Sequence, residues 1–165
     1  MNGLLIGRFQ PFHIGHLAAV KFALSTVQNL WIGIGSSNKS NGKRNPFTAD
    51  ERKEMILSSL DAETRNRIEI YYIPDTGDHE KWTYSIDSIV PKYDVVFSND
   101  DFTISLYKKR GMSVIPVPLL EREMVSGTNI RQMIVEGKDW YGLVPQGTKN
   151  VLLSISAKER LAKIL

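Results

Sequence analysis

Two histidines, His13 and His16, lie three residues apart in the stretch QPFHIGH near the start of the chain. They are two of only three histidines among 165 residues, and Arg8 precedes them closely. A guanidinium can bind phosphate oxygens through two parallel hydrogen bonds, and imidazole N–H groups add further donors. This combination favours the binding of an anion, in particular a polyphosphate.

A surface loop that happens to carry two histidines is the simplest alternative to an anion site. A zinc site is another, because residues three apart can share one face of a helix. His79 is the one further histidine in the sequence, and the HExxH pattern of zinc hydrolases does not occur. Zinc is therefore disfavoured, and we expect no metal ion held by protein side chains.

A second stretch with related chemistry, VSGTNIR, occurs late in the chain at residues 125–131. Ser126 or Thr128 can cap a helix, and Gly127 lets the backbone come close to a neighbouring group. Arg131 then lies about one turn into that helix, where its guanidinium can reach the same anion as the cap. An ordinary helix cap would explain this stretch alone, but not its pairing with the histidine stretch.

The hydrophobic pattern predicts the elements that must position these residues. Short apolar runs of strand length alternate with segments in which apolar residues return every three or four positions. The predicted strands lie at residues 2–7, 30–35, 68–73, 94–98 and 113–117. The predicted helices lie at residues 15–27, 45–60, 81–90, 102–110, 127–135 and 151–165.

This alternation predicts an α/β fold, a Rossmann-like doubly wound parallel sheet of about five strands with helices on both faces. In such sheets ligands bind at the carboxyl ends of the strands, near the point where the strand order reverses. Residues 7–16 leave the first predicted strand at that edge, with His13 and His16 at the start of the next helix. The positive end of the helix dipole would add to the attraction for an anion there.

Composition sets further limits. A chain of 165 residues, 42% hydrophobic and 24% charged, is expected to form one domain over residues 1–165, with a helical tail at about 145–165 that covers the core or a neighbouring subunit. Without cysteine, disulfides and thiolate metal sites are excluded. A net charge of +3 is too small an excess to favour nucleic-acid binding. With no targeting segment or membrane span apparent, we expect a cytoplasmic protein.

Together the two stretches resemble the signatures of the HxGH nucleotidyltransferase superfamily. The letters HIGH also occur in class I aminoacyl-tRNA synthetases, but the chain has no good KMSKS-like loop and is too short to add a tRNA-binding domain. A finer resemblance, over nearly the whole chain, is to archaeal-type nicotinamide-nucleotide adenylyltransferases. It rests on GRFQPFHIGH, NPFTADER at residues 45–52, IPD at residues 73–75, Trp82 and SGTNIR.

This resemblance implies transfer of AMP from ATP to nicotinamide mononucleotide (NMN), with NAD and pyrophosphate as products, Mg²⁺ as cofactor and a homohexameric assembly. It implies catalytic roles for Arg8, His13, His16 and Arg131. It also implies an ATP site formed by Gly7, Arg8, Phe9, His13, Gly15, His16, Ser126, Gly127, Thr128 and Arg131. The implied NMN site consists of Asn45, Arg52, Asp75 and Trp82, with Arg52 near the phosphates and Trp82 stacked on the nicotinamide ring.

The chemistry of this transfer agrees with the residues that the sequence supplies. Because the acceptor is already a phosphate anion, attack on the α-phosphorus needs no general base. Direct in-line attack needs no covalent intermediate, so positioning and charge stabilisation are the main requirements. Arginine and imidazole donors are suited to both.

Several roles have structural alternatives. Trp82 could be a core tryptophan on an amphipathic helix, and Arg52 could pair with the carboxylates near it on its helix. The loop at residues 36–44 is either a mobile lid over the nucleotide or a plain solvated loop. His79 is expected on a polar surface, and residues 121–123 are expected to form a solvated charge cluster.

The function also has alternatives. The same phosphate site could belong to a regulatory module that binds ATP without turnover. Within the transferases, the acceptor could be FMN or phosphopantetheine, or CMP could be transferred to an alcohol phosphate. Trp82 and the stretch at residues 45–52 favour NMN, while the use of nicotinic acid mononucleotide stays open.

Overall fold

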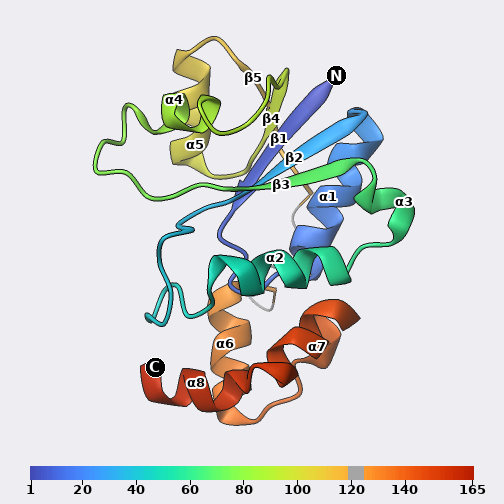
Figure 1. The fold of residues 1–165 in the computed structure, drawn as a ribbon, viewed down its shortest axis with the longest axis vertical. Helices are drawn as coiled ribbons and strands as arrows, with labels where there is room; N and C mark the ends of the chain where they lie inside the picture. The colour runs from blue at the N-terminus through green and yellow to red at the C-terminus, as the bar shows by residue number, and fades with distance from the viewer. Residues whose placement is uncertain (119–124) are drawn as a thin grey trace.

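The computed structural model of the protein describes residues 1–118 and 125–165. These residues form a parallel sheet of five strands in the order β3-β2-β1-β4-β5 (Figure 1). The strands are β1 (Asn2–Gly7), β2 (Asn29–Ile34), β3 (Ile68–Tyr72), β4 (Val95–Phe97) and β5 (Ser113–Ile115). The strand order reverses between β1 and β4, which confirms the predicted Rossmann-like doubly wound sheet.

Helices connect the strands and cover both faces of the sheet. They are α1 (Ile14–Thr26), α2 (Ala49–Ser58), α3 (Ala62–Arg65), α4 (Trp82–Asp87), α5 (Asp101–Lys109), α6 (Gly127–Glu136), α7 (Gln146–Ser154) and α8 (Ala157–Ile164), with a 3₁₀ helix η1 (Tyr141–Leu143). In Figure 1, α4 and α5 lie on one side of the sheet and α1 on the other, while α6, α7 and α8 form a group at the lower end. None of the helices in the described part of the chain is long and apolar enough to cross a membrane.

Each face of the sheet has its own core, because successive residues of a strand point to opposite sides. Leu5 of β1 belongs to a cluster with Val20 of α1 and Met55 of α2. Leu4 belongs to a second cluster with Ile86 of α4. Both leucines are buried, which explains why this strand reads as a continuous apolar run rather than as an alternating one.

The predicted elements differ from the structure mainly in length. β4 and β5 have three residues each. The helix predicted at residues 81–90 is α4, which is shorter and has no side-chain cap at Lys81. The tail contains two helices rather than one, because Ser156 between them has a left-handed φ of 54°, which an α-helix cannot continue.

Candidate active site

The two histidines of the HIGH stretch cap helix α1 together. Nδ1 of His13 accepts hydrogen bonds from the backbone N–H groups of Gly15 and His16 at 3.1 and 3.3 Å. Nδ1 of His16 accepts from the backbone N–H of His13 at 3.1 Å. This is a reciprocal capping box made by two imidazoles, whose rings are stacked with centroids 3.6 Å apart.

This capping arrangement determines which ring nitrogen carries hydrogen. A ring nitrogen that accepts a hydrogen bond has no hydrogen of its own, so the neutral form of each ring carries its hydrogen on Nε2. Burial lowers the pKa of His13 to about 4, and burial together with the nearby His13 holds the pKa of His16 well below its usual value. At neutral pH both histidines are therefore uncharged hydrogen-bond donors through Nε2.

Glycine between the two histidines is a steric requirement. A Cβ atom on Gly15 would lie 2.9 Å from Cε1 of His13, a distance that would push the imidazole off the backbone amides that it caps. Gly127 has the same role in the second stretch. A Cβ atom there would lie 2.9 Å from the carbonyl oxygen of Gln10 and from Nη1 of Arg131.

The second stretch begins helix α6 and brings Arg131 against the loop after β1. Ser126 is the cap, since its Oγ accepts from the backbone N–H of Asn129 at 3.1 Å, whereas Thr128 is exposed. Nη1 of Arg131 donates to the carbonyl oxygen of Gln10 at 2.7 Å. Its Nε is buried and has no hydrogen-bond partner among the described residues. Arg131 thus joins the two stretches and retains an unused donor.

Two cavities open beside the end of β1. The first, of about 450 Å³, is lined by residues of both stretches, including His13, His16, Ser126 and Gly127. The second, of about 590 Å³, is lined on the other side of β1 by residues that include Asn45, Asp75 and Trp82. Both cavities share a wall formed by Ile6, Gly7, Arg8 and Asp100.

The structure therefore brings together most of the predicted site residues. Of the predicted ATP-site residues, the first cavity is lined by Gly7, Arg8, Phe9, His13, Gly15, His16, Ser126 and Gly127. Around the second cavity, Oδ1 of Asp75 accepts from Ser36 Oγ at 2.9 Å, and Oδ1 of Asn45 accepts from Gln10 Nε2 at 3.5 Å. Trp82 is partly exposed at the cavity wall rather than fully enclosed in the core.

Three predicted site residues, Arg52, Thr128 and Arg131, line neither cavity as the described residues define them. Arg52 is the one whose guanidinium is fully occupied by backbone oxygens, and its side chain is 0% exposed. Its N–H groups donate to five backbone carbonyl oxygens, those of Thr48, Arg8, Gly35, Ser36 and Lys39, at 2.8 to 3.3 Å. Burial, with a further effect of Arg8, lowers its pKa to about 10, so it remains a cation at neutral pH.

This geometry gives Arg52 partners that neither sequence-based interpretation assumed. A phosphate could reach the guanidinium only by displacing several of these carbonyl bonds, so the predicted contact with NMN is not supported. The predicted alternative, pairing with carboxylates on the same helix, does not fit either, because the Arg52 guanidinium is hydrogen-bonded to backbone oxygens. Arg52 instead connects α2 by hydrogen bonds to the segments that follow β1 and β2. These segments include the first part of the loop at residues 36–44.

Other residues around the second cavity were not named as site residues from the sequence. They include Arg44, which belongs to the loop at residues 36–44 predicted as a lid or a solvated loop, and His79, Asp100 and Phe102. The carbonyl oxygen of Arg44 accepts from Nη1 of Arg8 at 3.4 Å. Burial lowers the pKa of Arg8 and of Arg131, and the nearby charge of Arg44 lowers both further. The basic run GKR at residues 42–44 was the available signal for Arg44. Residues 121–123, predicted to form a solvated charge cluster, lie outside the described residues.

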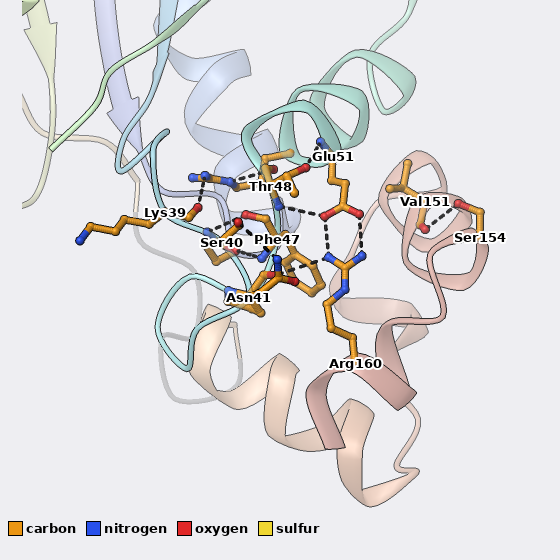
Figure 2. Close-up of polar contacts among 12 residues, drawn as sticks. Lys39, Ser40, Asn41, Phe47, Thr48, Glu51, Val151, Ser154 and Arg160 are labelled. Atoms are coloured by element: carbon orange, nitrogen blue, oxygen red, sulfur yellow. Dashed lines mark hydrogen bonds and ion pairs between the residues drawn. The ribbon is translucent and has the colours of Figure 1, made fainter. Parts of the chain in front are cut away.

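The C-terminal tail braces the start of α2. Arg160 of α8 forms a two-point ion pair with Glu51, with N–O distances of 2.6 and 2.8 Å, as Figure 2 shows. Glu51 also accepts from the backbone N–H of Thr48, which completes the capping box of α2. Leu152 and Leu161 of the tail are buried in the core cluster of this chain. The tail therefore covers the chain's own core, one of the two predicted possibilities.

Comparison with known proteins identifies one family, to which all the relatives given below belong. The cytidylyltransferase-like family profile matches residues 4–133. The nicotinamide-nucleotide adenylyltransferase of Thermococcus onnurineus is 39% identical over 161 residues, which cover 97% of this chain and 86% of that protein. The protein of the same name from Pyrococcus furiosus is 36% identical and covers 97% and 87%, respectively. The one from Saccharolobus solfataricus is 38% identical and covers 99% and 96%.

Solved structures show the same fold. A bifunctional NMN adenylyltransferase/ADP ribose pyrophosphatase from Francisella tularensis, in complex with AMP and a manganese ion, superposes with a TM-score of 0.78 at 21% identity. The match covers 98% of this chain and 52% of that one, so the chain spans about half the length of that protein. A second structure of this bifunctional protein gives a TM-score of 0.80 at 22% identity, covering 99% and 52%.

Proposed function

Given that the chain belongs to the nicotinamide-nucleotide adenylyltransferases, within the cytidylyltransferase-like family, we propose that it transfers AMP from ATP to NMN. The products are NAD and pyrophosphate, and the activity belongs to NAD biosynthesis. ATP occupies the first cavity, and NMN occupies the second.

The shared wall of the two cavities carries this proposal. Cavities of about 450 and 590 Å³ lie in the range of small-molecule sites, and each can hold one nucleotide. Gly7 and Arg8 line both, so the α-phosphate of ATP and the phosphate of NMN can meet at this point. Gly7 has no side chain to separate them, and Arg8 supplies a positive charge between two anions that repel each other.

The reaction is a single in-line displacement at phosphorus. A phosphate oxygen of NMN forms a bond to the α-phosphorus while the bond to the bridging oxygen of pyrophosphate breaks, and no proton is transferred. His13 and His16 donate hydrogen bonds through Nε2 to the oxygens on which charge develops. As neutral donors fixed by the capping box, they do so without reorganising during the reaction. Arg8 and Arg131 stabilise the triphosphate and the leaving pyrophosphate.

Arg131 is suited to this role by its unsatisfied donor. A buried guanidinium N–H without a partner is costly, and a phosphate oxygen would satisfy it. Arg131 is only 8% exposed. A phosphate group of ATP would therefore have to reach its guanidinium beside the start of α6. Arg44 lines the second cavity, where its guanidinium would bind the phosphate of NMN.

Mg²⁺ is proposed to accompany ATP. No group of three or more His, Cys, Asp or Glu side chains that could hold a metal ion occurs among the described residues. Mg²⁺ often binds through substrate phosphates, one or two carboxylates and water, so the residues present fit an ion that the nucleotide brings. Asp100, which lines both cavities, is the carboxylate that could add an oxygen ligand. The ion would neutralise charge on the phosphates.

Two further properties belong to the same proposal. We propose a homo-oligomer, a hexamer by family resemblance, and the exposed Tyr141 and Leu153 on the C-terminal helices offer apolar surface for contacts between subunits. A cytoplasmic location agrees with a sequence that contains no cysteine.

A mass-resolved product assay tests the proposed function. Purified protein is incubated with Mg·ATP and, in separate reactions, with NMN, nicotinic acid mononucleotide, FMN or phosphopantetheine. A further reaction contains Mg·CTP and an alcohol phosphate. We expect NAD and pyrophosphate in equal amounts from ATP and NMN. If product forms only with another acceptor, that acceptor and not NMN occupies the second cavity. ATP binding without any product would indicate a regulatory binding module.

A further inference from the structure

Phe102 is an exposed aromatic side chain at the mouth of the second cavity. It lies in the first turn of α5, two residues after Asp100, and 47% of its surface is exposed. A large apolar side chain in this position adds little to the core. Phe102 nevertheless lines the same cavity as Trp82, the residue expected to stack on the nicotinamide ring.

The rings of Phe102 and Trp82 are stacked at the wall of the second cavity. Their centroids are 6.4 Å apart and their planes are inclined by 30°. A flat ring in contact with both would need about 7 Å between them, because carbon atoms pack at about 3.5 Å. The exposed phenylalanine would therefore have to move outward when a ligand ring enters between the two faces. The two rings come from different helices, α5 and α4, so their separation can change without distorting either helix.

His79 supports the orientation of Phe102. Its imidazole lies with its centroid 5.4 Å from that of Phe102, at an angle of 89°, so that one ring presents its edge to the face of the other. His79 also lines the cavity. Three aromatic side chains therefore meet at the wall of the second cavity, which Arg8 also lines.

We propose that Phe102 forms the second face of the nicotinamide subsite, opposite Trp82. The proposal rests on the proposed function, because it assumes that NMN occupies this cavity. The nicotinamide ring of NMN is a flat, cationic pyridinium, and the negative faces of aromatic rings attract such a cation. Two aromatic faces hold it more tightly than one, and they fix the plane of the ring while Arg8 holds the phosphate.

Three substitutions at this position test the proposal, with steady-state kinetics and calorimetric titration of NMN into the protein. Phe102→Ala is expected to raise KM and Kd for NMN about tenfold, because one favourable aromatic contact is lost. KM for ATP is expected to change less than about twofold. Phe102→Tyr keeps the ring and is expected to bind NMN like the wild type. Phe102→Leu keeps apolar bulk without a π face and is expected to resemble Phe102→Ala.

Tyr84→Ala is the matched control. Tyr84 is also an exposed aromatic residue, 58% exposed on α4, but it contacts Arg110 away from the second cavity. This variant should leave KM for NMN unchanged. Unchanged NMN affinity in Phe102→Ala, or wild-type NMN affinity in Phe102→Leu, would overturn the proposal about Phe102. The proposed function would still stand in that case, provided that the wild-type protein forms NAD. A wild-type protein that forms no NAD and does not bind NMN would overturn both.

Discussion

Nη1 of Arg52 donates a hydrogen bond to the carbonyl oxygen of Arg8 at 3.0 Å, while the side chain of Arg8 lines both cavities. One arginine thus holds the backbone of another that faces the substrates. The same Nη1 atom bonds to the carbonyl of Gly35 after β2. Arg52 therefore fixes the ends of two neighbouring strands at the edge of the sheet where the site is formed.

Arg52→Lys should destabilise the protein and lower activity together. Lysine has three N–H donors on one atom and cannot reach five carbonyl oxygens, so several buried acceptors lose their partner. We expect the free energy of unfolding to fall by about 2–4 kcal/mol, and kcat/KM to fall for both substrates. Urea denaturation and steady-state kinetics measure the two effects. Arg65→Lys, at an exposed position on α3, is the control and should change stability by less than about 0.5 kcal/mol.

Substitutions of the two histidines should separate capping from catalysis. His16→Ala removes one preorganised donor and is expected to lower kcat by about 10²- to 10⁴-fold. His13→Asn retains an oxygen that can cap α1, whereas His13→Ala does not, so the asparagine variant should be more stable by about 1 kcal/mol. Both His13 variants should still have a strongly reduced kcat. A kcat close to the wild-type value in His16→Ala would contradict the proposed role of His16 as a hydrogen-bond donor in the reaction.

The ionisation state of the histidines predicts how stability depends on pH. The pKa of His13 is lowered by burial to about 4, against about 6.5 in the unfolded chain. Between these values the unfolded state binds more protons, so stability from this group is complete above about pH 6.5 and decreases as the pH falls towards 4. Urea denaturation at several pH values should show this decrease, with a shallower slope in His13→Asn. An identical slope in both proteins would contradict the assignment.

The tautomers can be observed directly. ¹⁵N NMR of protein labelled at histidine should show, for two of the three histidines, a hydrogen on Nε2 and none on Nδ1 from pH 6 to 8. The capping bonds at Nδ1 require this state. Titration of both rings near pH 6.5 would mean that the capping box does not persist in solution.

Gly127→Ala should impair the site although alanine usually favours a helix. Its Cβ atom would meet the carbonyl oxygen of Gln10 at 2.9 Å, and backbone cannot move aside as a flexible side chain can. We expect a loss of about 1–3 kcal/mol in stability and a lower kcat/KM. Gly142→Ala is the matched control, because a Cβ atom there would meet nothing within 4 Å among the described residues. Equal behaviour of the two variants would refute the steric argument.

The parts of the site that the sequence predicted are those with local signatures. Alternating apolar runs predict the sheet, and HIGH and SGTNIR each combine a helix start with groups that bind phosphate. Their positions follow from the rule that ligands bind at the carboxyl ends of strands. The structure agrees with these predictions at β1, α1 and α6 because the local preference and the fold favour the same conformation.

The parts that could not be predicted depend on contacts between distant segments. Arg52 lies next to acidic residues on its helix, so local pairing was a reasonable expectation. Its actual partners are carbonyl oxygens of chain segments that precede it by as many as 44 residues. Phe102 gives no sequence signal either, since its approach to Trp82 requires α4 and α5 to lie on the same face of the sheet.

The central claim is that AMP passes directly from ATP in one cavity to NMN in the other. The stereochemical course of the reaction tests it most directly. With an ATP analogue that carries sulfur at the α-phosphorus in one configuration, ³¹P NMR of the NAD analogue formed with NMN should show inversion at phosphorus, as a single in-line displacement requires. Retention of configuration would reveal a covalent intermediate and contradict direct transfer between the two cavities.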